Sequence, residues 1–462
     1  MAITLKCWGE CAGRLRGLAV FVTLVTALAV WPGGPAVIRA SAASTGGARA
    51  DTAQADTALS GTAQADTALA SRLDAVLDNA LAQQQIVGAV VVAARNGEVV
   101  YQRAVGMADR EKGKAMSLET RFRLASMSKP IVSAAALALA DQGMIGLDDP
   151  VTRWIPSFTP MFQGRVETEI TLRQLLTHTA GLSYGFLEPA DDPMALAEVS
   201  DGLDNPPITL EENIWRLASV PLYYEPGTGW RYSLAIDVLG EVVSRAGGDT
   251  LPAVVKKLVT GPLGMTATGF VADRPDMLAA AYVWAEGKPR RMAETEVVPH
   301  GNSATRYAPG RALDDQAYPS GGAGMVGTAG DYLKFLEAVR QEGGPVLKPQ
   351  TARAMTADQI CPVFSQKLSV TAGKTSEVVA PGWGFGFGGA VLLHPEKAEY
   401  GAGEGTLSWS GAYGSHFFMD RQNGISFVVL TNTTPTGMVG PFAVALAQAV
   451  YGQKADKKTV NK

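Results

Sequence analysis

A serine and a lysine lie three residues apart in the stretch RLASMSKPIVSAAALALADQG, which begins at Arg123. Residues at this spacing share one face of a helix, so Ser126 and Lys129 are predicted to lie side by side. Pro130 fits only the first helical turn, which places Ser126 at the helix start, where free N–H groups favour developing negative charge. A buried lysine has a lowered pKa and can take a proton from a hydroxyl, or it can stabilise an alkoxide beside it. The pair indicates an activated serine nucleophile; the alternative is a chance motif whose lysine extends to the surface.

Two further stretches carry groups that such chemistry needs. In EPGTGWRYSLAIDVLG, Ser233 is a predicted N-cap, and Tyr232 lies just before the helix. A phenol close to an ammonium has a lowered pKa and can act as general base and then general acid; simple packing is the alternative. In GTLSWSGAYGSHFF, Gly411 would let a substrate approach the backbone of a strand. An N–H group there could join that of Ser126 as an oxyanion donor; a β-bulge is the alternative.

The elements that must position these groups follow from hydrophobic patterns. SRLDAVLDNALAQQQ has helical spacing, and GAVVVAARNGEVVYQRAVG contains two β-branched runs joined by Asn96-Gly97, a hairpin signal. TLSWSGAYGSHFFMDRQNGISFVVLTN predicts two more strands around Asn423-Gly424, and an apolar helix follows. The middle, about 126–340, is predicted to be mostly helices and loops. Since an isolated hairpin is barely stable, the two terminal hairpins are expected to share one antiparallel sheet. The predicted class is α+β: an antiparallel sheet flanked by helices, a mainly helical lobe, and an active site in the cleft between them.

The chain ends predict export rather than catalysis. Residues 1–42 have the layout of a secretory signal peptide: basic residues, an apolar run, and Ala40-Ser41-Ala42 as a cleavage pattern. The apolar run is short for a membrane span, which is the alternative. Residues 43–70 repeat TAQADTAL and are predicted to be a low-complexity linker, 71–455 the catalytic domain, and 456–462 a polar tail. The predicted location is periplasmic or secreted, with no stable membrane span after signal removal.

Composition excludes several other functions. The 462 residues carry a net charge of −4, and no basic block with interleaved aromatics predicts nucleic-acid binding. The four histidines lie far apart without metal-ligand spacing, and no phosphate-binding glycine motif is present, so neither a metal nor a cofactor is predicted. The expected partner is a small-molecule ester or amide; the oligomeric state is not predicted.

Several other reactive residues are assigned structural roles. Cys361 would be the one cysteine left after signal removal and is predicted to be a buried or half-buried thiol. Ser183 lies in GLSYG, which matches the G-x-S-x-G pattern, but a helix rather than a strand is predicted before it, so we expect a turn residue. His178 is predicted to be structural, and His416 is a weak candidate for lining the cleft.

Taken together, the motifs resemble those of the class C β-lactamase-like serine hydrolases, and most closely the family VIII carboxylesterases. The stretches FRLASMSKP, ITLRQLLTHTAGL, EPGTGWRYSLAIDVLG, SGGAGMVGTAGDYLKF and WSGAYG carry the resemblance, which covers roughly residues 72–452. It implies that Ser126 is acylated, that Lys129 activates it and that Tyr232 shuttles the proton. It also implies an oxyanion hole made by the N–H groups of Ser126 and Ala412.

Two departures bear on the substrate. Leu234 stands where lactamases carry the asparagine of Tyr-x-Asn, and Trp409-Ser410-Gly411 replaces Lys-Thr-Gly on the edge strand. That lysine binds the substrate carboxylate, whereas an indole offers an apolar face and one N–H donor. We therefore favour hydrolysis of short-chain esters, or acyl transfer. The alternatives are a β-lactamase or D-amino-acid peptidase and a non-catalytic binding protein; Lys374-Thr375-Ser376 is rejected as a displaced Lys-Thr-Gly because it precedes the matching strand.

Overall fold

The structure is a computed structural model. It describes four stretches of the chain, namely residues 51–165, 169–360, 382–398 and 400–452. The predicted signal peptide, Cys361, the polar tail and the segment with Lys374 lie outside the described residues.

The chain divides into two compact units, Met1–Ala68 and Leu69–Lys462. Helix α2 (Asp51–Ala82) crosses the boundary, so it begins inside the segment predicted to be a linker. The second unit contains every predicted site residue.

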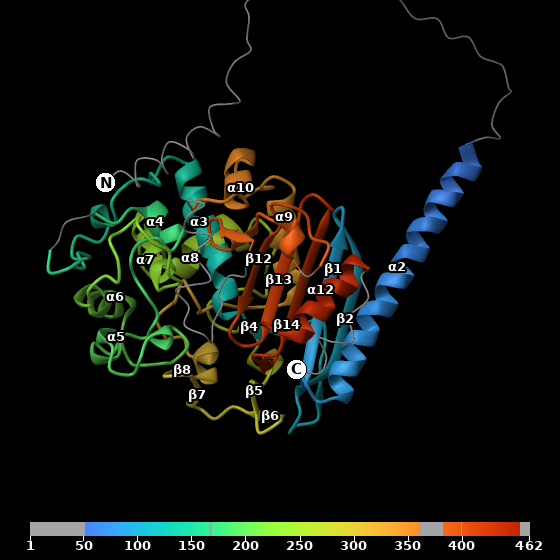
Figure 1. Ribbon diagram of the computed structural model, residues 1–462, viewed down its shortest axis with the longest axis horizontal. Coiled ribbons are helices and arrows are strands. Elements are labelled where there is room, and N and C mark those ends of the chain that lie inside the picture. Colours follow the sequence, from blue (N-terminus) through green and yellow to red (C-terminus); the bar gives the residue numbers. More distant parts are fainter. Residues whose placement is uncertain (1–50, 166–168, 361–381, 399, 453–462) are drawn as a thin grey trace, which may run out of the picture. The chain divides into compact units, whose positions relative to one another are not determined.

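An eight-stranded antiparallel sheet forms the centre of the second unit, in the order β10-β11-β12-β13-β14-β1-β2-β3 (Figure 1). The strands are β1 (Gly88–Arg95), β2 (Glu98–Asp109), β3 (Lys114–Ala115), β10 (Trp383–Phe385), β11 (Ala390–Leu392), β12 (Leu407–Gly411), β13 (Ser415–Asp420) and β14 (Ile425–Thr431). Strands β1 and β14 pair with Val91 opposite Val429, which joins the two terminal hairpins as predicted. Asn96 and Gly97 both have positive φ, at 54° and 95°, as a two-residue hairpin turn requires.

Both faces of this sheet are covered, which explains why GAVVVAAR is apolar without alternation. Val90 and Val92 contact the core shared with the helical lobe. Ala89 and Val91 point the other way, into a core completed by α2 and by α12 (Pro441–Tyr451).

The helical lobe and the helices beside it come from the middle of the chain. They are α3 (Ser128–Asp141), α4 (Leu172–Leu176), α5 (Pro193–Leu196), α6 (Leu210–Ser219), α7 (Ala235–Gly247), α8 (Leu251–Val255), α9 (Ala329–Arg340) and α10 (Pro349–Met355). Helix α3 is buried along nearly its whole length and packs against α7, while α9 lies on β1, β13 and β14. The antiparallel sheet with helices and a helical lobe confirms the predicted α+β fold.

The middle of the chain also contains short strands that the sequence did not predict. They are β4 (Phe122–Arg123), β5 (Tyr282–Ala285), β6 (Lys288–Arg291), β7 (Glu296–His300), β8 (Ser303–Tyr307) and β9 (Val326–Gly327), with β15 (Thr433–Thr434) beside β5. Strands β4 and β9 pair immediately before the predicted nucleophile. This pairing ties the turn at Ser126 to a segment two hundred residues away, which no local pattern indicates.

Candidate active site

Ser126 lies in a single 3-10 turn, Ala125–Met127, that leads directly into α3. Ala125 has φ of 45°, a left-handed conformation that few non-glycine residues adopt. Such backbone strain concentrates at functional sites. The prediction placed Ser126 at the helix start; the serine in fact occupies the tight turn just before the α-helix begins.

Lys129 is fully buried in the first turn of α3. Its Nζ atom donates hydrogen bonds to the Oγ atom of Ser126 at 3.3 Å and to the carbonyl of Gly322 at 2.8 Å. Burial lowers the pKa of Lys129 to about 7, although the nearby carboxylates of Asp237 and Asp201 oppose the shift. Near neutral pH, a substantial fraction of Lys129 is therefore a free amine that can accept a proton. The alternative in which Lys129 extends to the surface is wrong.

Tyr232 brings its ring against Lys129 from the segment just before α7. The Nζ atom of Lys129 lies over the Tyr232 ring, 4.5 Å from its centroid. Burial raises the pKa of Tyr232, while Ser126 and the Trp409 side chain are close enough to its hydroxyl to oppose this shift. The expectation of a lowered tyrosine pKa is wrong, because desolvation outweighs the effect of the neighbouring groups. Tyr232 is a neutral phenol, and its hydroxyl forms no well-aligned hydrogen bond with a described residue.

The predicted helix cap beside Tyr232 is also wrong. Ser233 does not cap α7, whose N-cap is Leu234 with no side-chain hydrogen bond. The Oγ atom of Ser233 instead lies 3.1 Å from Nδ1 of His178. The His178 ring also packs on Tyr232 with a centroid distance of 5.0 Å, so His178 has a structural role in holding this segment.

Strand β12 supplies the opposite wall of the site. The Trp409 ring packs on Tyr232 with a centroid distance of 5.3 Å. Gly411 touches the nucleophile turn: a Cβ atom there would lie 2.2 Å from the carbonyl oxygen of Leu124. Only glycine allows this approach. Ala412 follows at the end of the strand and packs beside Ala125 in a small apolar cluster.

The strand carrying Trp409 is not the edge of the sheet, contrary to expectation. Strand β12 lies between β11 and β13, and the two edge strands are β10 and β3. However, the pairing with β11 covers only Leu407 and Ser408, whereas the pairing with β13 continues through Gly411. The end of β12 therefore has a free side next to the nucleophile turn.

Sequence reasoning missed the buried polar group behind Lys129. A Cβ atom at Gly322 would lie 2.4 Å from Oδ2 of Asp237, 2.8 Å from the Tyr184 hydroxyl and 3.4 Å from Nζ of Lys129, so these atoms converge on one point. Asp237 is buried on α7, and neither of its oxygens forms a well-aligned hydrogen bond with a described residue. An acid in the apolar run LAIDVLG was the available signal, since burying a carboxylate is costly unless nearby groups compensate its charge.

The rival serine has a different role. Ser183 is buried, donates to Glu188 and accepts a hydrogen bond from Nε of Arg231 at 2.9 Å. It follows α4 without an intervening strand, so the nucleophile-elbow setting is absent in this described segment. Ser183 belongs to a structural network next to Tyr232.

His416 does not line the site. It shares the face of β13 that carries Phe418 and packs towards α12, whereas Phe417 faces the helical lobe. Among the described residues, no cluster of three or more His, Cys, Asp and Glu side chains could hold a metal ion. Likewise, none of the helices in the described ranges is long and apolar enough to cross a bilayer.

Comparison with known proteins identifies the class. The β-lactamase family profile matches residues 73–450. Esterase EstB of Burkholderia gladioli is 47% identical over 389 residues, covering 83% of this chain and 95% of that protein. The solved structure of EstCE1, described as a hydrolase with promiscuous acyltransferase activity, has a TM-score of 0.79 at 44% identity and covers 84% of this chain and 100% of its own. Simvastatin synthase from Aspergillus terreus, with a TM-score of 0.66 at 24% identity over 83% of this chain and 97% of its own, shares the fold.

The chain belongs to the β-lactamase family. The resemblance, the fold class and the enzyme class of serine hydrolase inferred from the sequence are thereby confirmed.

Proposed function

We propose that this protein hydrolyses short-chain carboxylic esters, or transfers their acyl groups, through an acyl-enzyme on Ser126. The observation that carries the proposal is the hydrogen bond from Lys129 to Ser126, made by a buried amine whose pKa is about 7. Similarity to an esterase and to a hydrolase with acyltransferase activity supports the reaction class.

In the proposed acylation step, neutral Lys129 takes the proton of Ser126 as Oγ attacks the carbonyl carbon of the ester. The negative charge that develops on the carbonyl oxygen would be stabilised by the N–H groups of Ser126 and Ala412. The close approach of β12 to the nucleophile turn at Gly411 supports this oxyanion hole.

Tyr232 would act as a neutral phenol that passes the proton from Lys129 to the departing alcohol. The C–O bond then breaks, the alcohol leaves with that proton, and the acyl group remains on Ser126. Deacylation reverses the roles: water, or a second alcohol in acyl transfer, gives its proton through Tyr232 to Lys129 and attacks the acyl carbon. The C–O bond to Ser126 then breaks, Lys129 returns the proton to Oγ of Ser126, and the carboxylic acid or the new ester leaves. The proximity of Ser126 and Trp409 to the Tyr232 hydroxyl supports this relay.

The substrate class follows from the walls of the site. Trp409 packs on Tyr232 and Phe385, each at 5.3 Å between ring centroids, and presents no cation for a substrate carboxylate. Neutral esters with small acyl groups are therefore favoured over β-lactams and D-amino-acid peptides. Periplasmic or secreted localisation remains a proposal from the N-terminal sequence.

The test compares hydrolysis of p-nitrophenyl butyrate with that of a chromogenic cephalosporin. Ester cleavage that is lost in Ser126→Ala and kept in Ser183→Ala supports the proposal. Retained activity in Ser126→Ala would reject the nucleophile, and a cephalosporin rate above the ester rate would reject the substrate class. If neither substrate is cleaved and an active-site phosphonate does not react, the binding-protein alternative is correct.

A further inference from the structure

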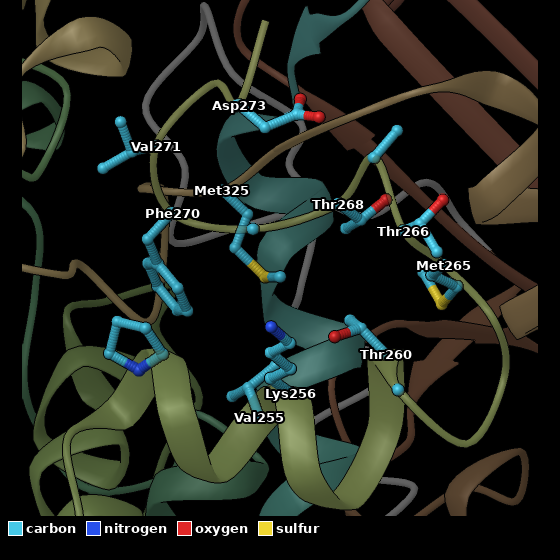
Figure 2. A pocket seen from close by; sticks show the side chains of 14 residues that line it. Val255, Lys256, Thr260, Met265, Thr266, Thr268, Phe270, Val271, Asp273 and Met325 are labelled. Atoms are coloured by element: carbon cyan, nitrogen blue, oxygen red, sulfur yellow. The ribbon is translucent and has the colours of Figure 1, made fainter.

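A cavity of about 260 Å³ lies behind the nucleophile helix, between α8 and the loop at residues 265–273 (Figure 2). None of the residues assigned to catalysis lines it. Apolar side chains form most of the wall: Pro252, Val255, Met265, Phe270, Val271 and Met325. Lys256 and Asp273 are the charged residues among those that line it.

A π-helical turn forms one side of this cavity. Helix α8 continues into Lys256–Thr260, where the N–H of Gly261 donates to the carbonyl of Lys256 at 2.8 Å. Such wide turns are rare and are frequently found at functional sites. The turn places both Lys256 and the buried residue Thr260 on the cavity wall.

The charge in the cavity is positive. The Nζ atom of Lys256 points into the cavity between Phe270 and Met325 (Figure 2), and it forms no hydrogen bond or ion pair within the described part of the chain. Asp273 is already neutralised by Arg121, whose Nε and Nη2 atoms donate to its two oxygens at 2.8 and 3.0 Å. Among the described lining residues, the exposed side chain of Lys256 therefore brings one unpaired ammonium group to the mouth of a largely apolar cavity.

We propose that this cavity binds a short aliphatic carboxylate, with its carboxylate on Lys256 and its hydrocarbon tail against Met265, Phe270 and Met325. A charged head on an apolar tail matches this wall, because the ammonium offers a charge-assisted hydrogen bond and the side chains offer apolar contact. At roughly 30 Å³ per water-sized group, the volume admits on the order of eight non-hydrogen atoms, which is the size of hexanoate.

The cavity is joined to the catalytic turn through the backbone of Met325. Its N–H donates to Oγ of Ser128 at 3.0 Å, and its carbonyl accepts from the N–H of Leu124 at 2.9 Å. Leu124 and Ser128 lie two residues before and two residues after Ser126 in the chain. A ligand on the Met325 side chain therefore contacts the segment that braces the nucleophile. Ester hydrolysis releases this class of ligand; that connection rests on the proposed function, whereas binding in the cavity does not.

The test is a titration of the full chain, labelled with ¹³C in its methionine methyl groups, with sodium hexanoate. Met265→Leu and Met325→Leu assign the two cavity signals, and Met127, which lies in the nucleophile turn itself, reports changes at the catalytic site. We expect saturable shifts of the Met265 and Met325 signals.

Lys256→Met should raise the dissociation constant of hexanoate at least about fivefold, since it removes a charge-assisted contact. The matched control Lys257→Met, which changes an adjacent exposed lysine outside the cavity, should leave it unchanged.

Three results would overturn the proposal. They are no shift at Met265 and Met325, equal binding of hexanol and hexanoate with no effect of Lys256→Met, and equal binding of inorganic phosphate. The first means that the cavity is empty of such ligands, the second that it is only apolar, and the third that it is a general anion site. The methionine signals do not depend on turnover, so they test ligand binding in the cavity even if p-nitrophenyl butyrate is not hydrolysed. Conversely, the absence of shifts at Met265 and Met325 would reject the cavity proposal and leave the proposed ester hydrolysis unaffected.

Discussion

The Nζ atom of Lys129 donates a hydrogen bond to the Oγ atom of Ser126 from a position that is closed to solvent. The carbonyl of Gly322 holds the amine from the other side at 2.8 Å. An ammonium in this position loses its hydration, so the neutral amine is favoured and a base is placed against the hydroxyl that must lose a proton. The proposed chemistry depends on this pair.

Replacing the base should remove activity without loss of the fold. In Lys129→Met, ester hydrolysis should fall by about 10²–10⁴-fold, the usual contribution of a positioned acid–base group. The thermal midpoint should be maintained or raised, because methionine fills the site without a desolvated amine. Hydrolysis rates and circular dichroism melts measure the two effects. Ser133→Ala is the control, as this buried serine one turn along α3 has no hydrogen-bond partner among the described residues. Full activity in Lys129→Met would contradict the assignment.

Activity should increase with pH through about 7. Lys129 must be neutral to accept the Ser126 proton, and its pKa in the folded protein is about 7. The folded pKa lies below the ordinary value of 10.5, so the unfolded chain binds more protons between these limits, and stability from this group rises with pH across that window. A profile of kcat/KM against pH tests the first statement. A rate that decreases as pH rises from 6 to 8 would mean that Lys129 acts as the ammonium instead.

Asp237 should set the pH at which the rate rises, without contacting the substrate. Its carboxylate raises the pKa of Lys129, so the isosteric change Asp237→Asn should move the rising limb of the profile to lower pH. Glu241→Gln, one turn further along α7, is the control. If Asp237→Asn lowers activity at every pH and the pH at which the rate rises stays the same, Asp237 has a purely structural role.

Gly411 should be indispensable for the approach of β12 to the nucleophile turn. In Gly411→Ala, the new methyl group would collide with the carbonyl oxygen of Leu124, which lies 2.2 Å from the built Cβ position. We expect kcat/KM to fall by at least about tenfold and stability to fall by about 1–3 kcal/mol.

The control for that change is Gly330→Ala in α9, where an added methyl group meets no atom within 4 Å. It should be neutral or stabilising by up to about 1 kcal/mol, since alanine is the better helix former. Similar losses in both variants would mean that the contact at Leu124 has no special importance.

Local sequence patterns predicted the sheet because its strands are long, buried and joined by turns with strong signals. Asn96 and Gly97 adopt the positive φ that their types favour, and the paired terminal hairpins follow from the need to bury apolar faces. The short pairs β4–β9 and β7–β8 escaped prediction, because segments of two to five residues have too little periodicity to be recognised.

The site was predictable where spacing along one helix decides the geometry, as for Ser126 and Lys129. It was not predictable where distant segments meet. The carbonyl of Gly322 reaches Lys129 across 193 residues, and Asp237 approaches it from another helix. The direction of the Tyr232 pKa shift depends on the burial of its side chain, which the sequence around this residue does not indicate.

The most direct test of the central claim is mass spectrometry of the full chain quenched during turnover of p-nitrophenyl butyrate. We expect a mass increase of one butyryl group, located by peptide fragmentation on Ser126 and absent from Ser126→Ala. A butyryl group on Ser183 or on any other residue, or hydrolysis at full rate by Ser126→Ala, would contradict it.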